Sequence, residues 1–240
     1  MMAAAGGAEH LRVLTWNVHG CVGRDRVFDP HRIADVLHMA QPDIAALQEI
    51  DARHAKSLAL DPFTFFADRF GWASVAARTL VTDDGHYGHI LMSRWPIESL
   101  GDEDLSLPRS EPRKAIFGAI EAPFGRLTVV AAHLGLLWLD RRKQLARLKA
   151  RLDALGGGPT LVLGDFNDYF RRGAADRAFC PPLTPAPALP TFPSRLPLLP
   201  LDRIWYDARL KLDSVGTLPE AGRLSDHLPV LASFSGRATV

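Results

Sequence analysis

Five apolar segments of this chain run directly into side chains that can bind a cation or transfer a proton, and this recurrence constrains the fold more than any other feature. The segments end, or are flanked at one end, at Trp16-Asn17, Gln48-Glu49, Ala132-His133, Gly164-Asp165-Phe166-Asn167 and Ser225-Asp226-His227. Strands packed in one sheet tend to bring such ends together along one edge. Buried carboxylates without partners are costly, so the clustered ends require a metal ion or a hydrogen-bonded network.

The N-terminal part of the chain reads as strand, helix, strand. Residues 11–20 begin as a β-rich run and end in polar groups. Asp29 can cap a helix whose first position is Pro30, and the apolar side chains that follow recur at helical spacing until Pro42 ends the helix. Residues 43–50 form a short apolar strand that again ends in polar groups.

The middle of the chain is rich in strand signals. Residues 72–78 and 86–97 are strand-like, and a polar loop over residues 79–85 separates them. Residues 113–123 and 125–136 are alternating or apolar runs joined by a turn-forming stretch, which predicts a hairpin.

A helix and a proline-rich stretch follow. Residues 139–155 predict a helix, and the glycines that come next end it. Its apolar stripe consists of Leu145, Leu148, Leu152 and Leu155. We interpret its basic residues as a solvated outer face. Residues 181–200 are too dense in proline for a regular helix or a central strand and predict a long surface loop. Further short strands are expected within residues 201–217 and 224–234.

The composition is that of an ordinary globular protein, with 47% hydrophobic and 23% charged residues. A formal net charge of +1 does not favour a dedicated nucleic-acid binder, although a local basic groove is compatible with it. The two cysteines, Cys21 and Cys180, form no metal-binding spacing and indicate reduced thiols. With no signal-peptide pattern and no membrane-length apolar run, we expect a cytoplasmic chain with a flexible tail over residues 1–10 and one domain over residues 11–240.

The residue types at the strand ends suit metal-assisted chemistry. Carboxylates and amides favour a hard divalent cation such as Mg²⁺ or Mn²⁺, and no histidine cluster at zinc spacing is present. Histidines beside carboxylates suit proton transfer near neutral pH. Taken singly, each residue has an ordinary alternative: Asn17 a turn residue, Glu49 a surface acid, His133 a core histidine and Asp202 a surface ion pair. As a set, they point to hydrolysis of a phosphate ester.

The order of motifs "TWNVHG", "ALQEID", "AAHLG", "GDFND", "LDRIWY" and "LSDHLPV" resembles the endonuclease/exonuclease/phosphatase superfamily, the deoxyribonuclease-I-like group, in its small bacterial metal-dependent branch. The resemblance extends from Leu11 to about Phe234. It implies a four-layer α-β-β-α sandwich, in which two mixed β-sheets pack face to face and are flanked by helices. The active site should lie where the strand ends of both sheets meet.

The resemblance also implies roles for individual residues. Glu49 resembles the metal-binding carboxylate, with Asn17 and Asp226 beside it. Asp165 resembles the residue that orients or deprotonates the attacking water, and Asn167 resembles a contact to the phosphate or transition state.

Two histidines complete the implied machinery. His227 resembles the histidine that binds the scissile phosphate or acts as an acid or base, oriented by Asp202. His133 matches the second histidine of the deoxyribonuclease-like and phospholipase-like branches, a candidate general acid for the leaving oxygen. Because abasic-site endonucleases lack it, His133 argues against that branch.

Two further residues are expected to contact substrate. His89 stands where many bacterial relatives have asparagine, and we expect it to lie in the active site near His133, with a structural strand histidine as the alternative. Arg113, in "EPRKA", is a candidate phosphate contact or an ordinary surface arginine.

We expect a Mg²⁺- or Mn²⁺-dependent hydrolase acting on a phosphodiester, with a phosphomonoesterase or a catalytically silent binding module as alternatives. The substrate stays undecided between nucleic acid and a phospholipid headgroup, and no protein partner is indicated. A nuclease needs a cationic groove, for which the candidates are Arg53, Lys56, Arg78, Arg109, Arg113, Lys114, Arg171 and Arg172. A lipid hydrolase needs an apolar rim, for which the proline-rich loop offers Phe192, Leu196, Leu198 and Leu199. We interpret these four residues as ordinary loop packing.

Overall fold

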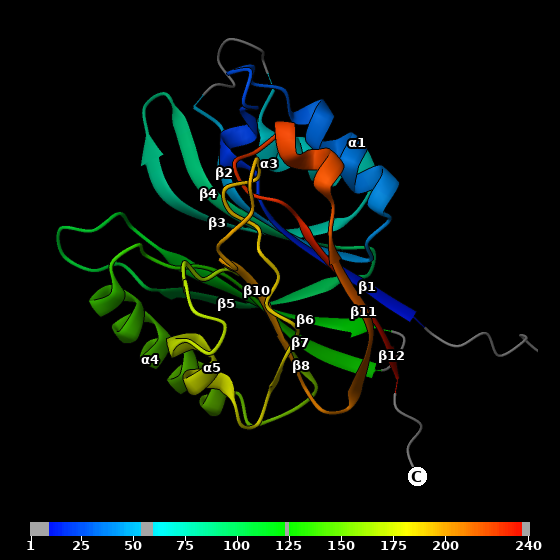
Figure 1. Ribbon diagram of the computed structural model, residues 1–240, viewed down its shortest axis with the longest axis vertical. Coiled ribbons are helices and arrows are strands. Elements are labelled where there is room, and N and C mark those ends of the chain that lie inside the picture. Colours follow the sequence, from blue (N-terminus) through cyan, green and yellow to red (C-terminus); the bar gives the residue numbers. More distant parts are fainter. Residues whose placement is uncertain (1–9, 54–59, 123–124, 237–240) are drawn as a thin grey trace, which may run out of the picture.

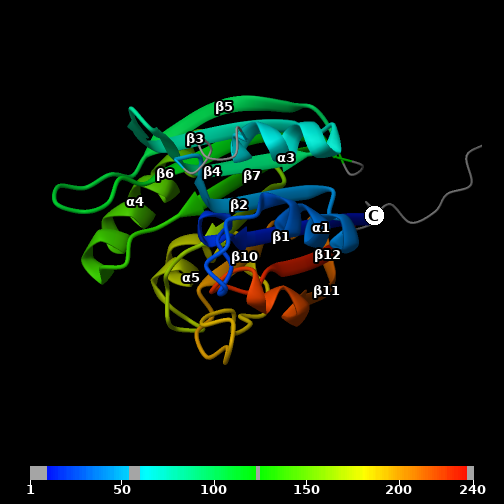
Figure 2. The same cartoon turned by 90° about the horizontal axis from the view of Figure 1, so that it is seen from above.

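Two mixed β-sheets of six strands each pack face to face in the computed structural model, which describes residues 10–53, 60–122 and 125–236 (Figure 1). Helices cover the outer face of each sheet, which gives the four layers α-β-β-α seen in Figure 1, and Figure 2 looks down onto these layers from above. The predicted fold class is therefore confirmed. The expected flexible tail falls almost entirely on residues 1–9, which lie outside the described residues.

The first sheet has the strand order β11-β12-β1-β2-β4-β3. In that order its strands span Leu210–Thr217, Val230–Gly236, His10–Asn17, Ile44–Asp51, Gly85–Ser93 and Ala73–Thr82. Only β1 and β2 pair in parallel, because α1 (Pro30–Ala40) connects them as a crossover. The Asp29 carboxylate accepts a hydrogen bond from the His31 amide at the start of α1, as its sequence predicts.

The second sheet has the strand order β5-β6-β7-β8-β10-β9. In that order its strands span Ile97–Asp104, Lys114–Ala122, Gly125–His133, Thr160–Asp165, Asp202–Tyr206 and Thr184–Pro185. Its one parallel pair is β7 with β8, connected by α4 (Trp138–Ala154). The expected hairpin is β6 and β7.

Three layers of apolar side chains hold the sandwich together. Alternate residues of β1 point to opposite faces, so Leu11 and Val13 pack between the sheets while Leu14 and Trp16 pack towards the helices. The helices over the first sheet are α1 and α3 (Pro62–Phe70), and those over the second are α4 and α5 (Ala174–Phe179). Burial on both faces explains why these strands read as continuous apolar runs rather than alternating ones.

The structure corrects several local expectations. The polar loop expected over residues 79–85 is mostly strand, because β3 and β4 continue to a tight turn at residues 83–84. Leu155 lies beyond the end of α4 and is exposed, so it does not belong to the buried stripe that Leu145 and Leu148 form. The proline-rich stretch of residues 181–200 is irregular, as predicted, apart from the two-residue edge strand β9. The described residues also contain two short 3₁₀ helices, η1 (His19–Cys21) and η2 (Pro219–Arg223).

Candidate active site

The register of the second sheet places three of the predicted residues in one row. His133, the last residue of β7, pairs with Asp165, the last residue of β8. Asp165 in turn pairs with Asp202, the first residue of β10. Residues in register on adjacent strands point to the same face. Three side chains separated by up to 69 positions in the sequence therefore meet at one end of the sheet.

A glycine makes this row possible. Gly164 has φ +146°, and a Cβ atom there would lie 1.9 Å from the carbonyl oxygen of Ala132 on the neighbouring strand. Only glycine allows β7 and β8 to approach this closely, immediately before the carboxylate of Asp165.

The first sheet contributes Asn17 and Glu49 from the ends of β1 and β2. A β-bulge between Leu47 and Ile50 contains Glu49, whose φ of +58° is rare for a residue other than glycine. The Asn17 amide Nδ2 donates to Glu49 Oε1 at 2.8 Å and to Asp165 Oδ2 at 3.1 Å. This one side chain therefore joins the two sheets across the site.

His227 lies between two carboxylates. Its Nδ1 is 2.8 Å from Asp202 Oδ2, and its Nε2 is 3.8 Å from Asp165 Oδ2. Burial lowers the pKa of His227, but the charges of Asp202 and Asp165 outweigh that effect and raise it to about 10. The imidazole is therefore a cation at neutral pH, with Nε2 directed towards Asp165 and Nδ1 held by Asp202.

The backbone around His227 is anchored by groups from both neighbouring motifs. The buried Ser225 hydroxyl donates to the Asn17 carbonyl at 2.7 Å and accepts from the His227 amide at 3.1 Å. The Trp16 indole donates to the His227 carbonyl at 3.0 Å. These bonds fix the loop before β12 against the end of β1.

Asp165 is the centre of the network. Burial is the main reason why the pKa of its carboxyl is raised; the His227 charge opposes the rise and the Asp202 charge adds to it. Its Oδ1 accepts from the Asn167 amide at 2.9 Å, and its Oδ2 lies 3.6 Å from His133 Nε2. A carboxyl that is buried between two imidazoles is suited to holding or accepting a proton near neutral pH.

His133 is held by an arginine rather than by a carboxylate. The buried Arg113 guanidinium contacts His133 Nδ1 at 3.2 Å and donates to Glu111 at 2.9 Å. Since a guanidinium only donates, Nδ1 must accept and Nε2 must carry the proton. Burial and the Arg113 charge lower the pKa of His133 well below its ordinary range, so the ring is neutral and presents Nε2–H to the site. Arg113 thus acts on His133, and its buried side chain is a poor phosphate contact.

His89 lies beneath this pair on β4, and its side chain is 2% exposed. Burial and the Arg113 charge lower its pKa to about 4, so it is neutral. The structure places it in the electrostatic surroundings of His133, as expected, but inside the core rather than on a surface that substrate reaches. A direct contact to substrate is therefore not supported by its burial.

Asn167 adopts φ +48°, another left-handed conformation at the site. Its side chain donates to the Leu134 carbonyl at 2.9 Å and is almost fully buried. In this arrangement it fastens the segment after β8 to the segment after β7. Strained non-glycine residues of this kind cluster at functional sites.

The open part of the site is acidic and attracts positive charge. Glu49 Oε2 and Asp226 Oδ1 lie 3.8 Å and 3.5 Å from His19 Nδ1, and all three side chains reach solvent. The pKa of His19 is raised, with the bond to Glu49 as the largest cause. Although burial raises the pKa of Glu49, His19, His133 and Asn17 lower it to about 2. Two carboxylates that converge beside one imidazole form an oxygen donor set that fits a hard divalent ion.

A second, buried carboxylate pair lies beside this cluster. Ligand atoms of Asp165, Asp202 and His227 all lie within 4.8 Å of one another. Asp202 Oδ1 has no hydrogen-bond partner among the described residues. Because His227 already occupies the other Asp202 oxygen, we interpret this trio as a proton-holding network, and the solvent-reached Glu49 and Asp226 as the cation site.

The structure thus brings together all the predicted catalytic and metal-binding residues, while Arg113 and His89 lie behind them. The sequence interpretation assigned no role to His19 or Ser225, although both lie within recognised motifs, "TWNVHG" and "LSDHLPV". The sequence does contain a signal for His19, because this histidine stands two positions after Asn17, which is a predicted metal-site residue.

The sequence model of the Endonuclease/Exonuclease/phosphatase family matches residues 14–227. The uncharacterized protein YbhP of Escherichia coli K12 is 33% identical over 247 residues, which cover 93% of this chain and 96% of YbhP. Both similarities extend over the motifs that carry the site.

Solved structures with the same fold have diverse names. The human Nocturnin catalytic domain with bound sulfate is 22% identical, with a TM-score of 0.74 over 95% of this chain and 94% of that one. The mannosyl-6-phosphatase Bt3783 of Bacteroides thetaiotaomicron is 19% identical, with a TM-score of 0.75 over 93% and 99% of the two chains. D. rerio TDP2 with a single-strand DNA product is 17% identical, with a TM-score of 0.68 over 94% and 99%. At these identities the likeness concerns the fold.

Proposed function

The chain belongs to the endonuclease/exonuclease/phosphatase family, and from this membership and the geometry of its site we propose that it hydrolyses phosphodiesters with a Mg²⁺ or Mn²⁺ ion. The observation that carries the proposal is the meeting of Glu49, Asp165 and His227. They come from both sheets, and the Asn17 amide connects two of them directly.

Glu49 and Asp226 would hold the ion through their carboxylate oxygens, and Asn17 would keep Glu49 in place. When bound, the ion supplies positive charge that offsets the negative charge of the phosphate. His19, whose imidazole lies between the two carboxylates, would have to move aside or share them.

The remaining residues hold and move protons. Asp165 has the position and the raised pKa to accept a proton from the attacking water. His227, kept cationic by Asp202, would bind a phosphate oxygen through Nε2–H. His133 would donate a hydrogen bond from Nε2 to the leaving oxygen as a neutral imidazole, a more limited role than the full general acid expected from sequence.

Two alternatives belong to other classes of activity. A phosphomonoesterase would use the same site, and one structural relative is named as a mannosyl-6-phosphatase. A silent binding module is the less supported alternative, because Glu49, Asp165 and His227 are present and converge.

Hydrolysis of bis-p-nitrophenyl phosphate tests the proposal, with p-nitrophenyl phosphate as the monoester comparison. We expect activity with Mg²⁺ or Mn²⁺, none in EDTA, and a loss of about 10²-fold or more in His227→Ala. His38→Ala, an exposed histidine of α1, is the matched control and should keep the wild-type rate. A faster monoester reaction would favour the phosphatase, and inactivity on all substrates would favour the binding module. We also propose the cytoplasmic location expected from the sequence. Fractionation of cells tests it.

A further inference from the structure

Exposed hydrophobic side chains concentrate around the active site. Of the twelve large hydrophobic residues exposed in the described part of the chain, eight lie on three segments that adjoin the catalytic residues. We define this apolar rim as Leu136, Leu137, Trp138, Leu139, Tyr169, Phe170, Leu196 and Leu198. Soluble proteins rarely expose so many large apolar side chains in one place without a binding function.

Chain neighbours, hydrogen bonds and ring contacts attach each segment to the site. Leu136–Leu139 follow His133, and Arg141 behind them donates to the Gly135 carbonyl and stacks 5.1 Å from the Tyr169 ring. Tyr169 and Phe170 lie two and three positions after Asn167 in the chain.

The third segment reaches the site through Phe192. The Phe192 ring lies 4.9 Å from the His227 ring, and its carbonyl accepts from the Leu198 amide at 2.9 Å. Leu196 and Leu198 are 65% and 66% exposed, so ordinary loop packing, the interpretation based on sequence, is wrong for these two residues. The apolar rim therefore follows His133 in the chain on one side of the site and connects to His227 through Phe192 on the other.

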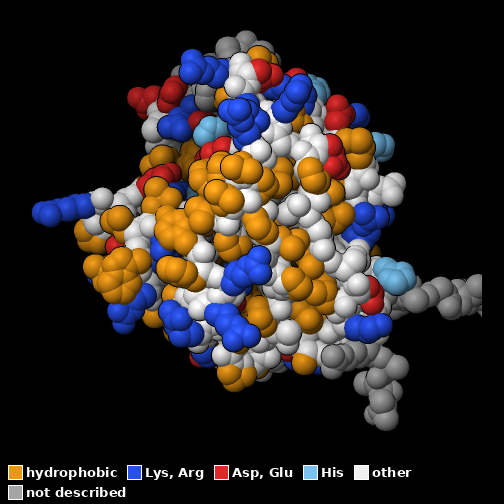
Figure 3. All heavy atoms as spheres, viewed as in Figure 1, with side chains coloured by type: hydrophobic (Ala, Val, Ile, Leu, Met, Phe, Trp, Pro, Cys, Tyr) orange, Lys and Arg blue, Asp and Glu red, His pale blue; other side chains and the backbone are white. Residues whose placement is uncertain are grey.

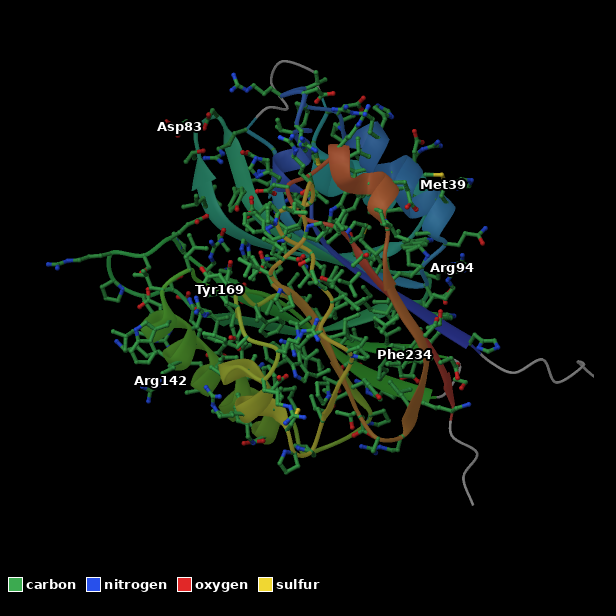
Figure 4. The ribbon with its side chains drawn as sticks, in the orientation of Figure 1. Met39, Asp83, Arg94, Arg142, Tyr169 and Phe234 are labelled. Carbon is green, nitrogen blue, oxygen red and sulfur yellow. The ribbon has the colours of Figure 1, made fainter. Side chains whose placement is uncertain are left out.

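Cationic side chains accompany every part of the apolar rim. Arg142 and Lys143 follow the first segment, Arg171 and Arg172 the second, and Arg195 precedes the third; all five are exposed. The sole acid within residues 136–143, 169–172 and 195–198 is Asp140, which accepts a hydrogen bond from Ser110. Figure 3 shows hydrophobic side chains gathered on this face with Lys and Arg among them, and in Figure 4 Tyr169 and Arg142 lie on the side that carries α4.

We propose that the apolar rim and its cations dock onto an anionic phospholipid bilayer and that the diester bond hydrolysed is that of a lipid headgroup. Apolar side chains beside exposed Lys and Arg are the pattern of peripheral membrane binding, in which the side chains enter the interface and the cations contact lipid phosphates. Among the described residues no helix is long and apolar enough to cross a membrane, and the docking proposed here needs none. The docking stands on the surface alone, whereas the substrate class rests on the proposed function.

A single-stranded nucleic acid is the main competing partner, because aromatic residues with arginines can also stack bases. Five of the eight rim residues are leucines, which offer no ring for stacking. Arginines already lie over two of the aromatic rings, Arg142 over Trp138 and Arg141 over Tyr169.

Three of the eight candidates for a cationic groove that would bind nucleic acid are paired with carboxylates. Arg53 pairs with Asp51, Arg113 with Glu111 and Lys114 with Asp102. Arg78 stacks over Phe63, and Lys56 lies outside the described residues. The exposed candidates Arg171 and Arg172 adjoin the apolar rim, and it is this rim that favours the lipid surface.

Flotation of the full chain with vesicles tests the docking without any catalytic readout. We expect binding to vesicles of phosphatidylcholine with phosphatidylglycerol, and weaker binding to phosphatidylcholine alone or in high salt. Phe170→Ser and Leu198→Ser should each lower the partition coefficient about tenfold. Met39→Ser on α1 is the matched control, because Met39 and Leu198 are both 66% exposed, and it should bind as wild type does. Circular dichroism spectra verify that each variant is folded.

The outcomes separate the docking from the proposed function. A wild-type chain that cleaves bis-p-nitrophenyl phosphate but does not float would overturn the docking and leave the hydrolase standing. A chain that floats but cleaves no phosphodiester would overturn the hydrolase and leave the docking standing. Binding of a fluorescent single-stranded oligonucleotide, lost in Phe170→Ser and without flotation, would identify nucleic acid instead. If Leu198→Ser and Phe170→Ser float with vesicles to the same extent as the wild type, docking through the apolar rim would also be refuted.

Discussion

Asp202→Asn is expected to destabilise the metal-free chain in a pH-dependent way, because the Asp202 carboxylate stabilises the charged form of His227. The Asp202 Oδ2 and His227 Nδ1 atoms are 2.8 Å apart, and the two side chains are 0% and 7% exposed. Folding raises the pKa of His227 from its ordinary value of 6.5 to about 10. At ~1.4 kcal/mol for each tenfold change, this rise corresponds to about 5 kcal/mol shared between Asp202 and Asp165.

The sign follows from the direction of the shift. Because the folded state holds the proton more tightly, the stabilisation is complete below the ordinary pKa of 6.5 and is lost as the pH rises through about 10. If Asp202 supplies half of the effect, Asp202→Asn should cost roughly 2–3 kcal/mol near pH 6 and about 1.3 kcal/mol near pH 9. Asparagine keeps the shape of the side chain, so packing contributes little to this difference.

Urea unfolding in EDTA at the two pH values measures this loss. Asp213→Asn is the control, since Asp213 faces His10 at 3.7 Å in an exposed pair and should contribute less than ~1 kcal/mol at either pH. An equal loss in Asp202→Asn near pH 6 and near pH 9 would refute the reasoning, because Asp202 would then act through hydrogen bonding or packing rather than through the His227 charge.

Three further changes test other parts of the site. Mg²⁺ at about a hundred times its Kd should stabilise the wild-type chain by ~2.7 kcal/mol in calorimetric scans, and Glu49→Gln should abolish the shift; an undiminished shift would place the ion elsewhere. Arg113→Met should raise the pH at which the His133 ring titrates by NMR, since the Arg113 charge lowers that pKa; an unchanged titration would exclude the contact as its cause. Gly164→Ala should lower the free energy of unfolding in urea by about 3 kcal/mol or more, because its Cβ would overlap a backbone carbonyl. Gly216→Ala, where the added Cβ meets free space, should change it by under ~0.5 kcal/mol, and equal losses in the two variants would contradict the close approach of β7 and β8.

Much of the fold follows from local signals, and α1 is the clearest example. Asp29 and Pro30 mark its start in the sequence, and the structure begins the helix there. The same pair, Asp61 and Pro62, starts α3, so that helix was available to the same reasoning but was not identified.

The sequence predicts which residues form the site but not how they contact one another. The motifs locate Asp165 and His133 at strand ends, yet their pairing depends on register, which no single strand encodes. The contact between Arg113, which precedes β6, and His133 at the end of β7 limits the role expected for His133 and takes Arg113 away from the substrate. The exposure of Leu198 depends on which way an irregular loop turns, a property that a proline-rich sequence does not specify.

The strand order has a consequence for synthesis of the protein. The first sheet is built from both ends of the chain, because β1 lies between β2 and β12, whereas the second sheet comes entirely from the stretch between β5 and β10. The nascent chain can therefore complete the second sheet on the ribosome while β1 still has a vacant edge. His227, which stands just before β12, is among the last groups to arrive. A ribosome-bound fragment that lacks both His227 and β12 should therefore not show the proposed hydrolysis.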